Sequence, residues 1–335
     1  MARIALDAMG GDFAPTAPVG GALLALADLG PEHRIQLIGR EAELVAALDT
    51  ALAGDYAQHA AQRSRIDIID APDIIGMSDR PTAVMRRPHS SMAVGLRQHA
   101  EGLADAFVSC GNTGAQMAAS VQQLGLHHGL KRPAIGTIFP TALHTLVVLD
   151  SGANVDCGPE ELVHFARLGL VYAEDILGRV NPAVGLLSIG EEPEKGNAVV
   201  KAAHQLLAQT DLHFVGNVEG RDVAAGCCDR GPFDVVVCDG FTGNVILKFY
   251  EGLAPILVEM VAKSIGGDAK QLMKGLAHLD YSNYGGAPLL GVRGVSIIAH
   301  GKSSPRAIKN AVNVAVRAVE SRMSEHIGRR LGATD

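Results

Sequence analysis

The sequence contains no tryptophan, and aromatic residues make up only 4% of it. Hydrophobic residues nevertheless account for 47% of the 335 residues, so the core must be built mainly from alanine, valine, leucine and isoleucine. With 39 glycines and no low-complexity tract, the composition is typical of an α/β enzyme with many turns and excludes a disordered chain. A chain of this length indicates two domains or one large one.

Basic runs, cysteine pairs and long apolar runs are also missing. The formal net charge is −7, which argues against nucleic acid as a partner. No run reaches the roughly 18 apolar residues of a membrane span, and no signal peptide precedes the first expected strand, so we expect a cytoplasmic protein. The cysteines show no Cys-x-x-Cys spacing, as in a reduced cytosolic protein. They are Cys110, Cys157, Cys227, Cys228 and Cys238.

Familiar catalytic motifs are absent as well. There is no Gly-x-Gly-x-x-Gly, so nothing indicates a dinucleotide site. Residues 301–303 resemble the end of a P-loop, but Ser296 stands where its first glycine is required. Ser188 is not the serine of a Gly-x-Ser-x-Gly elbow, because Leu186 occupies the glycine position. No His-x-x-x-His pair with a carboxylate partner occurs, and we expect neither a catalytic metal nor a cofactor.

What the sequence does contain is a repeated strand–turn–helix pattern rich in glycine and asparagine. Residues 239–244 follow the apolar run 234–238 and lead into an amphipathic stretch. The turns at 110–115 and 190–197 are built in the same way. Ligands of open α/β sheets bind outside the carboxyl ends of the strands, and helix N-termini attract anions. The three turns therefore predict a site for a phosphate-like group.

Each turn also has a purely structural explanation. Asp239 or Thr242 could cap the helix that follows. Lys195 could be a solvated side chain, or a cation for phosphate or a developing oxyanion. Cys110 could be a nucleophile, although a small buried residue is the simpler interpretation.

Strand and helix patterns alternate along most of the chain, which favours a largely parallel sheet. The patterns include a single strand at 134–139 and a single long helix at 305–330. No linker marks a domain boundary.

Read in order, the turns and several further motifs resemble the acyl-carrier-protein:phosphate acyltransferases of bacterial phospholipid synthesis, the PlsX family. The resemblance spans nearly the whole chain. The matching segments are 4–12, 14–15, 90–92, 109–115, 149–154, 195–197, 216–222, 239–244, 281–286 and 300–301.

The resemblance implies a three-layer α/β/α sandwich of the isocitrate/isopropylmalate dehydrogenase and phosphotransacetylase kind. It implies one phosphate acyltransferase unit over residues 1–335, with or without a division into two subdomains. The implied reaction converts acyl-[acyl carrier protein] and inorganic phosphate into acyl phosphate and free carrier. The implied protein is a homodimer at the inner face of the cell membrane, and it passes acyl phosphate to a membrane glycerol-3-phosphate acyltransferase.

The resemblance also assigns site residues. It favours Lys195 and Asn244 as the catalytic pair that polarises the thioester carbonyl or neutralises the developing charge. We expect bound phosphate to attack directly, without an acyl-enzyme. The substrate-binding residues that it implies are Asp7, Gly10, Gly11, Ser90, Ser91, Gly111, Asn112, Thr113, Gly114, Asn154, Asn197, Asp239, Gly240, Thr242 and Gly243.

Two departures from the family pattern affect the assignment. Lys302 separates Gly301 from Ser303, which leaves the role of Ser303 open. The stretch before Ser90 carries Arg86 and Arg87, followed by proline and histidine where members of the family can be more cationic. These two arginines suit phosphate, or they are solvated ahead of an ordinary capped helix.

The segment 245–285 is expected to contact the dimer partner and the membrane. Its first helix has an apolar face at 253, 256, 257, 260 and 261. A second, shorter face flanked by lysines suits an interface with anionic lipid, or a dimer-contact hairpin. The expected membrane residues are Leu272, Met273 and Leu276.

Three other functions remain open. A phosphotransacetylase that uses acyl-coenzyme A shares the fold and the reaction type. A dehydrogenase of the same fold would need a metal cluster or a nucleotide fingerprint. A non-catalytic scaffold would bind phosphate or acyl carrier without turnover.

Overall fold

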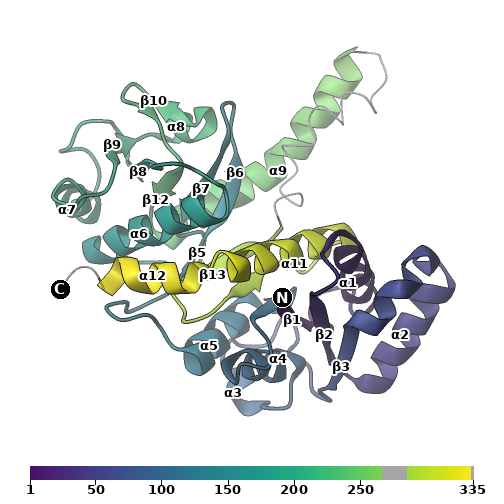
Figure 1. Ribbon diagram of the computed structural model, residues 1–335. Helices are drawn as coiled ribbons and strands as arrows, with labels where there is room; N and C mark the ends of the chain where they lie inside the picture. Colours follow the sequence, from purple (N-terminus) through teal and green to yellow (C-terminus); the bar gives the residue numbers. More distant parts are fainter. Residues whose placement is uncertain (266–284, 333–335) are drawn as a thin grey trace. The chain divides into compact units, whose positions relative to one another are not determined.

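The computed structural model of the protein describes residues 1–265 and 285–332 (Figure 1). The chain forms two compact units. Unit 1 comprises Met1–Gly129 and Gly285–Asp335, and unit 2 comprises Leu130–Tyr284. Unit 1 is therefore built from both ends of the chain, and unit 2 from its middle. This discontinuity explains why no linker is visible in the sequence.

Unit 1 contains a largely parallel sheet with the strand order β3-β2-β1-β4-β14-β13. Its central strands are buried on both faces, and all three of Ile4, Ala5 and Leu6 have no exposed surface. Such continuous apolar runs are typical of parallel strands covered by helices on both sides. The strands are β1 (Arg3–Asp7), β2 (Arg34–Gly39), β3 (Ile66–Asp70), β4 (Ala106–Ser109), β13 (Ala287–Leu290) and β14 (Ser296–Ile298).

Helices cover both faces of this sheet (Figure 1). On one face α1 packs against both α2 and α11, and on the other α3, α4 and α5 pack against one another. The short helix η1 packs against α1 and α2, and α12 packs against α11. The helices are α1 (Thr16–Asp28), α2 (Glu41–Ala53), η1 (Ala57–Arg65), α3 (Ala83–Arg86), α4 (Ser91–Ala100), α5 (Thr113–Leu124), α11 (Pro305–Glu320) and α12 (Met323–Gly332).

The strand order of unit 1 reverses between β1 and β4. From β1 the chain moves outward through β2 to β3, and it then returns through α4 to place β4 on the other side of β1. A ligand crevice forms at such a switch point, outside the carboxyl ends of the two strands. The residues that follow Asp7 and Ser109 therefore occupy the expected position of a site in unit 1.

Unit 2 contains a second sheet with the order β6-β7-β12-β8-β9, in which only the β6–β7 pair is antiparallel. A two-stranded β10–β11 ribbon lies between β9 and β12 in the sequence. The strands of this unit are β5 (Ala134–Ile135), β6 (Thr137–Pro140), β7 (Thr145–Leu149), β8 (Val184–Leu187), β9 (Phe214–Val218), β10 (Cys227–Cys228), β11 (Gly231–Pro232) and β12 (Val235–Val237).

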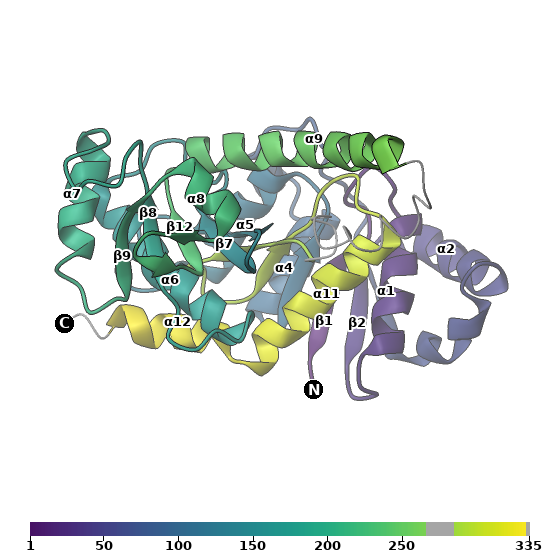
Figure 2. The same ribbon diagram turned by 90° about the horizontal axis from the view of Figure 1, so that it is seen from above.

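Helices also flank the sheet of unit 2. Helices α6 (Pro159–Asp175) and α7 (Ala198–Leu207) pack together. Residues of α8 (Gly220–Ala225) and the first turns of α9 (Gly240–Ile265) contact an apolar cluster that includes Phe139 and Phe233. Helix α9 continues as one long helix (Figure 2). Within the described residues, no helix combines the length and apolar character needed to cross a bilayer.

The predicted α/β architecture is confirmed, but two predicted elements are interrupted. The strand expected at 134–139 is divided at Gly136 into β5 and β6, which belong to different sheets; the N–H and C=O of Ile135 bond to Asp150 and Ser151. The helix expected at 305–330 is divided into α11 and α12. Arg322 has a φ of 54°, a left-handed conformation that ends a helix.

Candidate functional site

In unit 1, a buried carboxylate links the ends of β1 and β4. Asp7 is only 2% exposed, and the Ser109 hydroxyl donates a 2.7 Å hydrogen bond to its Oδ2. The Gly111 N–H in turn donates to Ser109 Oγ at 2.9 Å, and the Ser91 side chain also hydrogen-bonds to Asp7. Burial raises the pKa of the Asp7 carboxyl, although these hydrogen bonds oppose the shift. Asp7 therefore organises the turns rather than offering a free charge to a ligand.

The glycines of these turns allow close approach of three loops. A Cβ on Gly10 would lie 2.6 Å from Asp7 Oδ2 and 2.8 Å from the Gly111 nitrogen. Gly11 has a φ of 93°, which favours glycine. Directly after it, the Asp12 N–H donates to the Gly301 carbonyl at 2.8 Å, so the loop after β14 joins the loops after β1 and β4.

Asn112 begins α5, but its side-chain amide is already engaged. Its Oδ1 accepts a 3.0 Å hydrogen bond from the Ala115 N–H, which caps the helix. Its Nδ2 donates to the carbonyls of Asp79 at 2.8 Å and Met77 at 3.1 Å. Thr113 is exposed at the first helical position. The N-terminus of α5 therefore presents backbone N–H groups rather than the Asn112 amide to an anion.

The serines and arginines before α4 are also structural in large part. Ser90 caps the helix by accepting from the Ala93 N–H, and it donates to the Arg87 carbonyl at 2.8 Å. The Arg87 guanidinium bonds to Asp79 at 2.6 Å and to the Ile74 carbonyl at 2.8 Å. Arg87 thus stabilises the loop that Asn112 also holds.

Cys110 is an unsuitable nucleophile. Burial, together with the nearby negative charge of Asp7, raises the pKa of its thiol to about 12. Ser303, whose role the sequence leaves open, hydrogen-bonds to this thiol. Since the thiolate is the reactive form, Cys110 is a packing residue at neutral pH.

In unit 2, a second buried carboxylate organises the turn after β7. Asp150 has no exposed surface, and its Oδ1 accepts from the N–H groups of Ile135 at 2.9 Å and Ala153 at 3.1 Å. Its Oδ2 accepts from the backbone N–H of Asn154 at 2.6 Å and from the Asn154 side-chain amide at 2.9 Å. Burial nevertheless raises the pKa of Asp150.

The turn after β12 packs directly on that of Asp150. The Gly240 N–H donates to the Asn154 carbonyl at 2.7 Å. A Cβ on Gly240 would lie 2.6 Å from Asp150 Oδ2, and one on Gly243 would lie 2.0 Å from the Asp150 carbonyl oxygen. Asn244 is exposed beside Gly152, where a Cβ would lie 3.5 Å from Asn244 Oδ1. The contacts between the two turns therefore determine where Asn244 lies.

Asp239 caps α9, as one of the structural explanations predicted. Its Oδ1 accepts from the Thr242 N–H at 2.7 Å, and its Oδ2 accepts from the Thr242 hydroxyl at 2.9 Å. Both side chains are consequently occupied within the turn.

Lys195 lies on the turn after β8, the strand that pairs with β12. Its side chain is exposed, and its stem packs on Gly190, where a Cβ would lie 2.8 Å from Lys195 Cγ. Asn197 caps α7 through a 2.9 Å hydrogen bond from the Val200 N–H. Because β8 and β12 are adjacent and parallel, the turns of Lys195 and Asn244 occupy the same end of this sheet.

The predicted residues thus form two clusters, one in each unit. The unit 1 cluster contains Asp7, Gly10, Gly11, Ser90, Ser91, Gly111, Asn112, Thr113 and Gly114. The unit 2 cluster contains Asn154, Lys195, Asn197, Asp239, Gly240, Thr242, Gly243 and Asn244. The predicted membrane residues Leu272, Met273 and Leu276 lie outside the described residues.

Two side-chain groups in the described part of the chain could hold a metal ion by geometry. One is Glu32, His33 and Glu320, and the other is Glu191, Glu219 and Asp222. Arg221 already pairs with all three carboxylates of the second group. The expectation that the reaction needs no metal stays a prediction.

Comparison with known proteins decides the family. The family described as "Fatty acid synthesis protein" matches residues 2–326. The chain belongs to this family. The resemblance to phosphate acyltransferases is thereby confirmed, and with it the expectation of an acyltransferase.

Similar curated proteins carry the name phosphate acyltransferase. The one from Desulforamulus reducens is 46% identical over 330 residues, covering 96% of this chain and 94% of its own. That from Heliobacterium modesticaldum is 46% identical and covers 97% of each chain. That from Aquifex aeolicus is 43% identical and covers 94% of this chain and 92% of its own.

Solved structures show the same fold at much lower identity. A phosphotransacetylase from Streptococcus pyogenes is 16% identical, with a TM-score of 0.60 over 95% of this chain and 94% of its own. A branched-chain phosphotransacylase from Enterococcus faecalis is 13% identical, with the same TM-score over 95% of this chain and 99% of its own. The predicted phosphotransacetylase-like fold is confirmed.

Three residues that the sequence did not select as site residues hold this acyltransferase's turns together. Ser109 joins the ends of β1 and β4. Asp150 holds the turn after β7, and Asn217 contacts the turn that carries Lys195. All three are fully buried polar residues at or just after strand ends. Each stands in a segment that matched the family, so the segment, but not the role, was visible in the sequence.

The first test concerns the close approach of α9 to Asp150. Gly243→Ala should destabilise the protein by about 1–3 kcal/mol or more, because the new Cβ would overlap a backbone oxygen. Gly252→Ala on the same helix is the matched control, since nothing lies within 4 Å of its Cβ position. It should stabilise α9 by about 0.5–1 kcal/mol. Urea unfolding measures both, and equal stabilities of the two variants would contradict the packing.

The second test concerns Cys110. Iodoacetamide at about pH 8 should leave Cys110 unmodified in the folded protein, because its thiol stays protonated and buried. Peptide mass spectrometry should find it modified in urea, with the half-buried Cys227 as the control that reacts sooner. Cys110→Ala should keep acyltransferase turnover within a few-fold. Complete loss of turnover in a folded Cys110→Ala would support a covalent mechanism instead.

Proposed function

We propose that this protein transfers a fatty acyl group from acyl carrier protein to inorganic phosphate, forming acyl phosphate for phospholipid synthesis. The full-length similarity to proteins named phosphate acyltransferase supports this reaction. The observation that carries it is the pair of turns after β8 and β12, which bring an exposed lysine and an exposed asparagine to one end of a sheet. A cation and an amide donor suit a thioester carbonyl that becomes an oxyanion.

In the proposed mechanism, a phosphate oxygen attacks the thioester carbonyl carbon directly. Lys195 and Asn244 stabilise the negative charge that develops on the carbonyl oxygen. The carbon–sulfur bond then breaks, the acyl group stays on phosphate, and the carrier thiolate leaves to be protonated. The raised thiol pKa of Cys110 supports a route without an acyl-enzyme. Positioning of the two reactants can supply up to about 7–11 kcal/mol of the barrier.

The unit 1 cluster is proposed to bind an anionic part of the substrates. Its support is the glycine turn at the β1–β4 switch point together with the N-terminus of α5. The N–H groups of Gly10 and Gly111 already bond to Asp7 and to Ser109 Oγ, and the Asp7 and Asn112 side chains are likewise occupied by other protein groups. We therefore assign Asp7 and the Asn112 side chain a supporting role instead of direct contact with phosphate.

The third test measures phosphate-dependent release of free thiol from long-chain acyl carrier protein. Lys195→Ala and Asn244→Ala should each lower kcat by about 100- to 1,000-fold, the loss typical of one oxyanion donor. Lys201→Ala, which removes an exposed lysine on the following helix, is the matched control and should retain full turnover. Unchanged turnover in both site variants would reject the catalytic assignment.

The same assay separates the other functions. Faster turnover of acetyl-coenzyme A than of acyl carrier protein would indicate a phosphotransacetylase. No phosphate-dependent release at all by the wild type would indicate a binding scaffold. A stoichiometric acyl-enzyme formed from labelled acyl carrier without phosphate would reject direct attack.

We further propose that the protein is a homodimer and a peripheral protein of the inner membrane face, where acyl phosphate would reach a glycerol-3-phosphate acyltransferase. The exposed apolar side chains of α9 support a contact surface, with Val245 51% and Phe249 69% exposed on one face. Their i, i+4 spacing places both side chains on the same side of the helix. The segment with Leu272, Met273 and Leu276 remains the predicted lipid contact.

The fourth test addresses these two contacts separately. Val245→Glu/Phe249→Glu should give a monomer by light scattering, because charges would enter an apolar interface. Val180→Glu, at a 95% exposed valine elsewhere in unit 2, should stay dimeric. Leu272→Glu/Leu276→Glu should lose flotation with anionic liposomes while remaining dimeric. A wild-type monomer would contradict the dimer contact. Unchanged flotation of Leu272→Glu/Leu276→Glu would contradict the lipid contact.

A further inference from the structure

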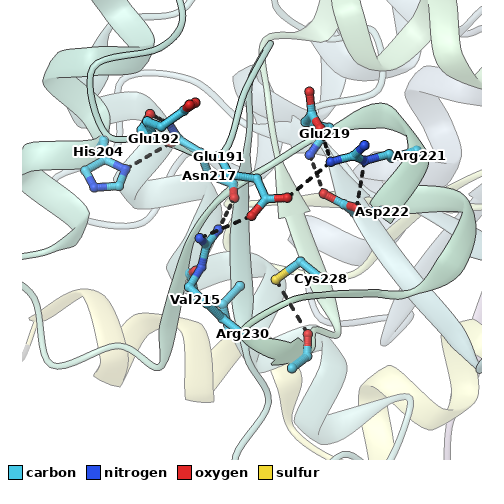
Figure 3. A network of polar contacts seen from close by, with 11 residues as sticks. Glu191, Glu192, His204, Val215, Asn217, Glu219, Arg221, Asp222, Cys228 and Arg230 are labelled. Carbon is cyan, nitrogen blue, oxygen red and sulfur yellow. Dashed lines mark hydrogen bonds and ion pairs between the residues drawn. The ribbon is translucent and has the colours of Figure 1, made fainter.

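A single carbonyl oxygen connects Lys195 to a buried asparagine in the next strand. The Glu192 carbonyl accepts a 3.0 Å hydrogen bond from the Lys195 N–H and a 2.8 Å hydrogen bond from Asn217 Nδ2. Figure 3 shows Asn217 below this part of the turn. The backbone of Lys195 is thus only two hydrogen bonds away from Asn217.

Asn217 is itself held at both ends of its amide. It has no exposed surface, and its Oδ1 lies 2.9 Å from Nδ1 of His204 (Figure 3). An amide oxygen only accepts, so His204 must donate from Nδ1. His204 lies on α7, the helix that begins just after Asn197, and its ring packs edge-on against Phe214 with centroids 5.2 Å apart. These contacts connect the turn after β8 to Asn217 on β9, and Asn217 to His204 on α7, the helix that begins just after the same turn.

Ion pairs also hold the turn after β8, on its solvent-exposed side. The Glu191 carboxylate lies 3.3 Å from Arg221 and 3.6 Å from Arg230, and Arg230 also bonds to the carbonyls of Val215 and Asn217 (Figure 3). Arg221 is 74% exposed, and exposed ion pairs contribute little to stability. The buried amide of Asn217 therefore constrains the turn more than these ion pairs do.

We infer that Asn217 is a positioning residue for Lys195, and that His204 orients Asn217. This inference rests on the catalytic role proposed for Lys195. Without the Asn217 amide, the Glu192 carbonyl loses one of its two donors, and the turn that carries Lys195 gains freedom. The lysine stem packs on Gly190 of the same turn, so its direction depends on where the turn lies.

The fifth test begins with Asn217→Ala. We expect kcat to fall by up to about 100-fold with KM nearly unchanged, because misplacement of a catalytic group affects the transition state most. Amide hydrogen exchange should become faster over residues 190–197. Gln205→Ala, which changes an exposed neighbour of His204 on α7, is the matched control and should alter neither quantity.

Two further variants separate positioning from general loss of structure. His204→Ala should reproduce part of the kcat loss, whereas His204→Asn should restore it, since the asparagine amide can donate from nearly the position of Nδ1. In the Lys195→Ala background, Asn217→Ala should cost no further activity, because the two residues act as one unit. Additive losses, or unchanged exchange over residues 190–197, would overturn the inference.

Failure of the proposed function gives a different result. An inactive wild type or a fully active Lys195→Ala variant would reject the catalytic role of Lys195. Hydrogen exchange does not depend on turnover, so it still decides whether Asn217 holds the turn. Amide exchange over residues 190–197 that is as slow in Asn217→Ala as in the wild type would reject the inference, even if Lys195 proves essential.

Discussion

The buried carboxylate of Asp150 is the constraint on which the proposed catalytic end of unit 2 depends. It accepts hydrogen bonds from four N–H groups, and the turn that carries Asn244 packs directly on it. A buried carboxylate is costly unless it is fully hydrogen-bonded. Asp150 therefore requires the surrounding turns to adopt one arrangement, and the glycines at 240 and 243 are needed because any side chain there would displace it.

The same principle recurs at the other strand ends. In unit 1, Asp7 accepts from serine hydroxyls and backbone N–H groups at the ends of the paired strands β1 and β4. In unit 2, Asn217 joins β9 to the turn that carries Lys195. In all three places a buried polar side chain connects loops that are distant in the sequence. Fully satisfied polar networks of this kind make a site rigid, because each member loses a partner if another moves.

The residues proposed to react are exposed, and the residues that support them are buried. Lys195 and Asn244 are exposed, as groups that meet a substrate must be. Asn112, Asp239 and Asn197 resemble binding residues in the sequence, but they are helix caps whose side chains bond to backbone groups. Asparagine and aspartate at the start of a helix serve both purposes equally well. The spacing of residues in a motif therefore does not distinguish a helix cap from a binding residue.

The sequence by itself determined the alternation of strands and helices, the glycine turns at the strand ends and the family. These features are local: the turns predicted at 110–115, 190–197 and 239–244 follow strands β4, β8 and β12, because apolar periodicity and turn residues act over a few positions. Only the tertiary structure decided that Asn112 bonds to a loop more than thirty residues earlier, that Asp150 bonds to the Ile135 N–H, and that Asn217 supports the Lys195 turn. Those contacts join segments far apart in the chain, and a polar residue shows no partner until folding brings one within hydrogen-bonding distance.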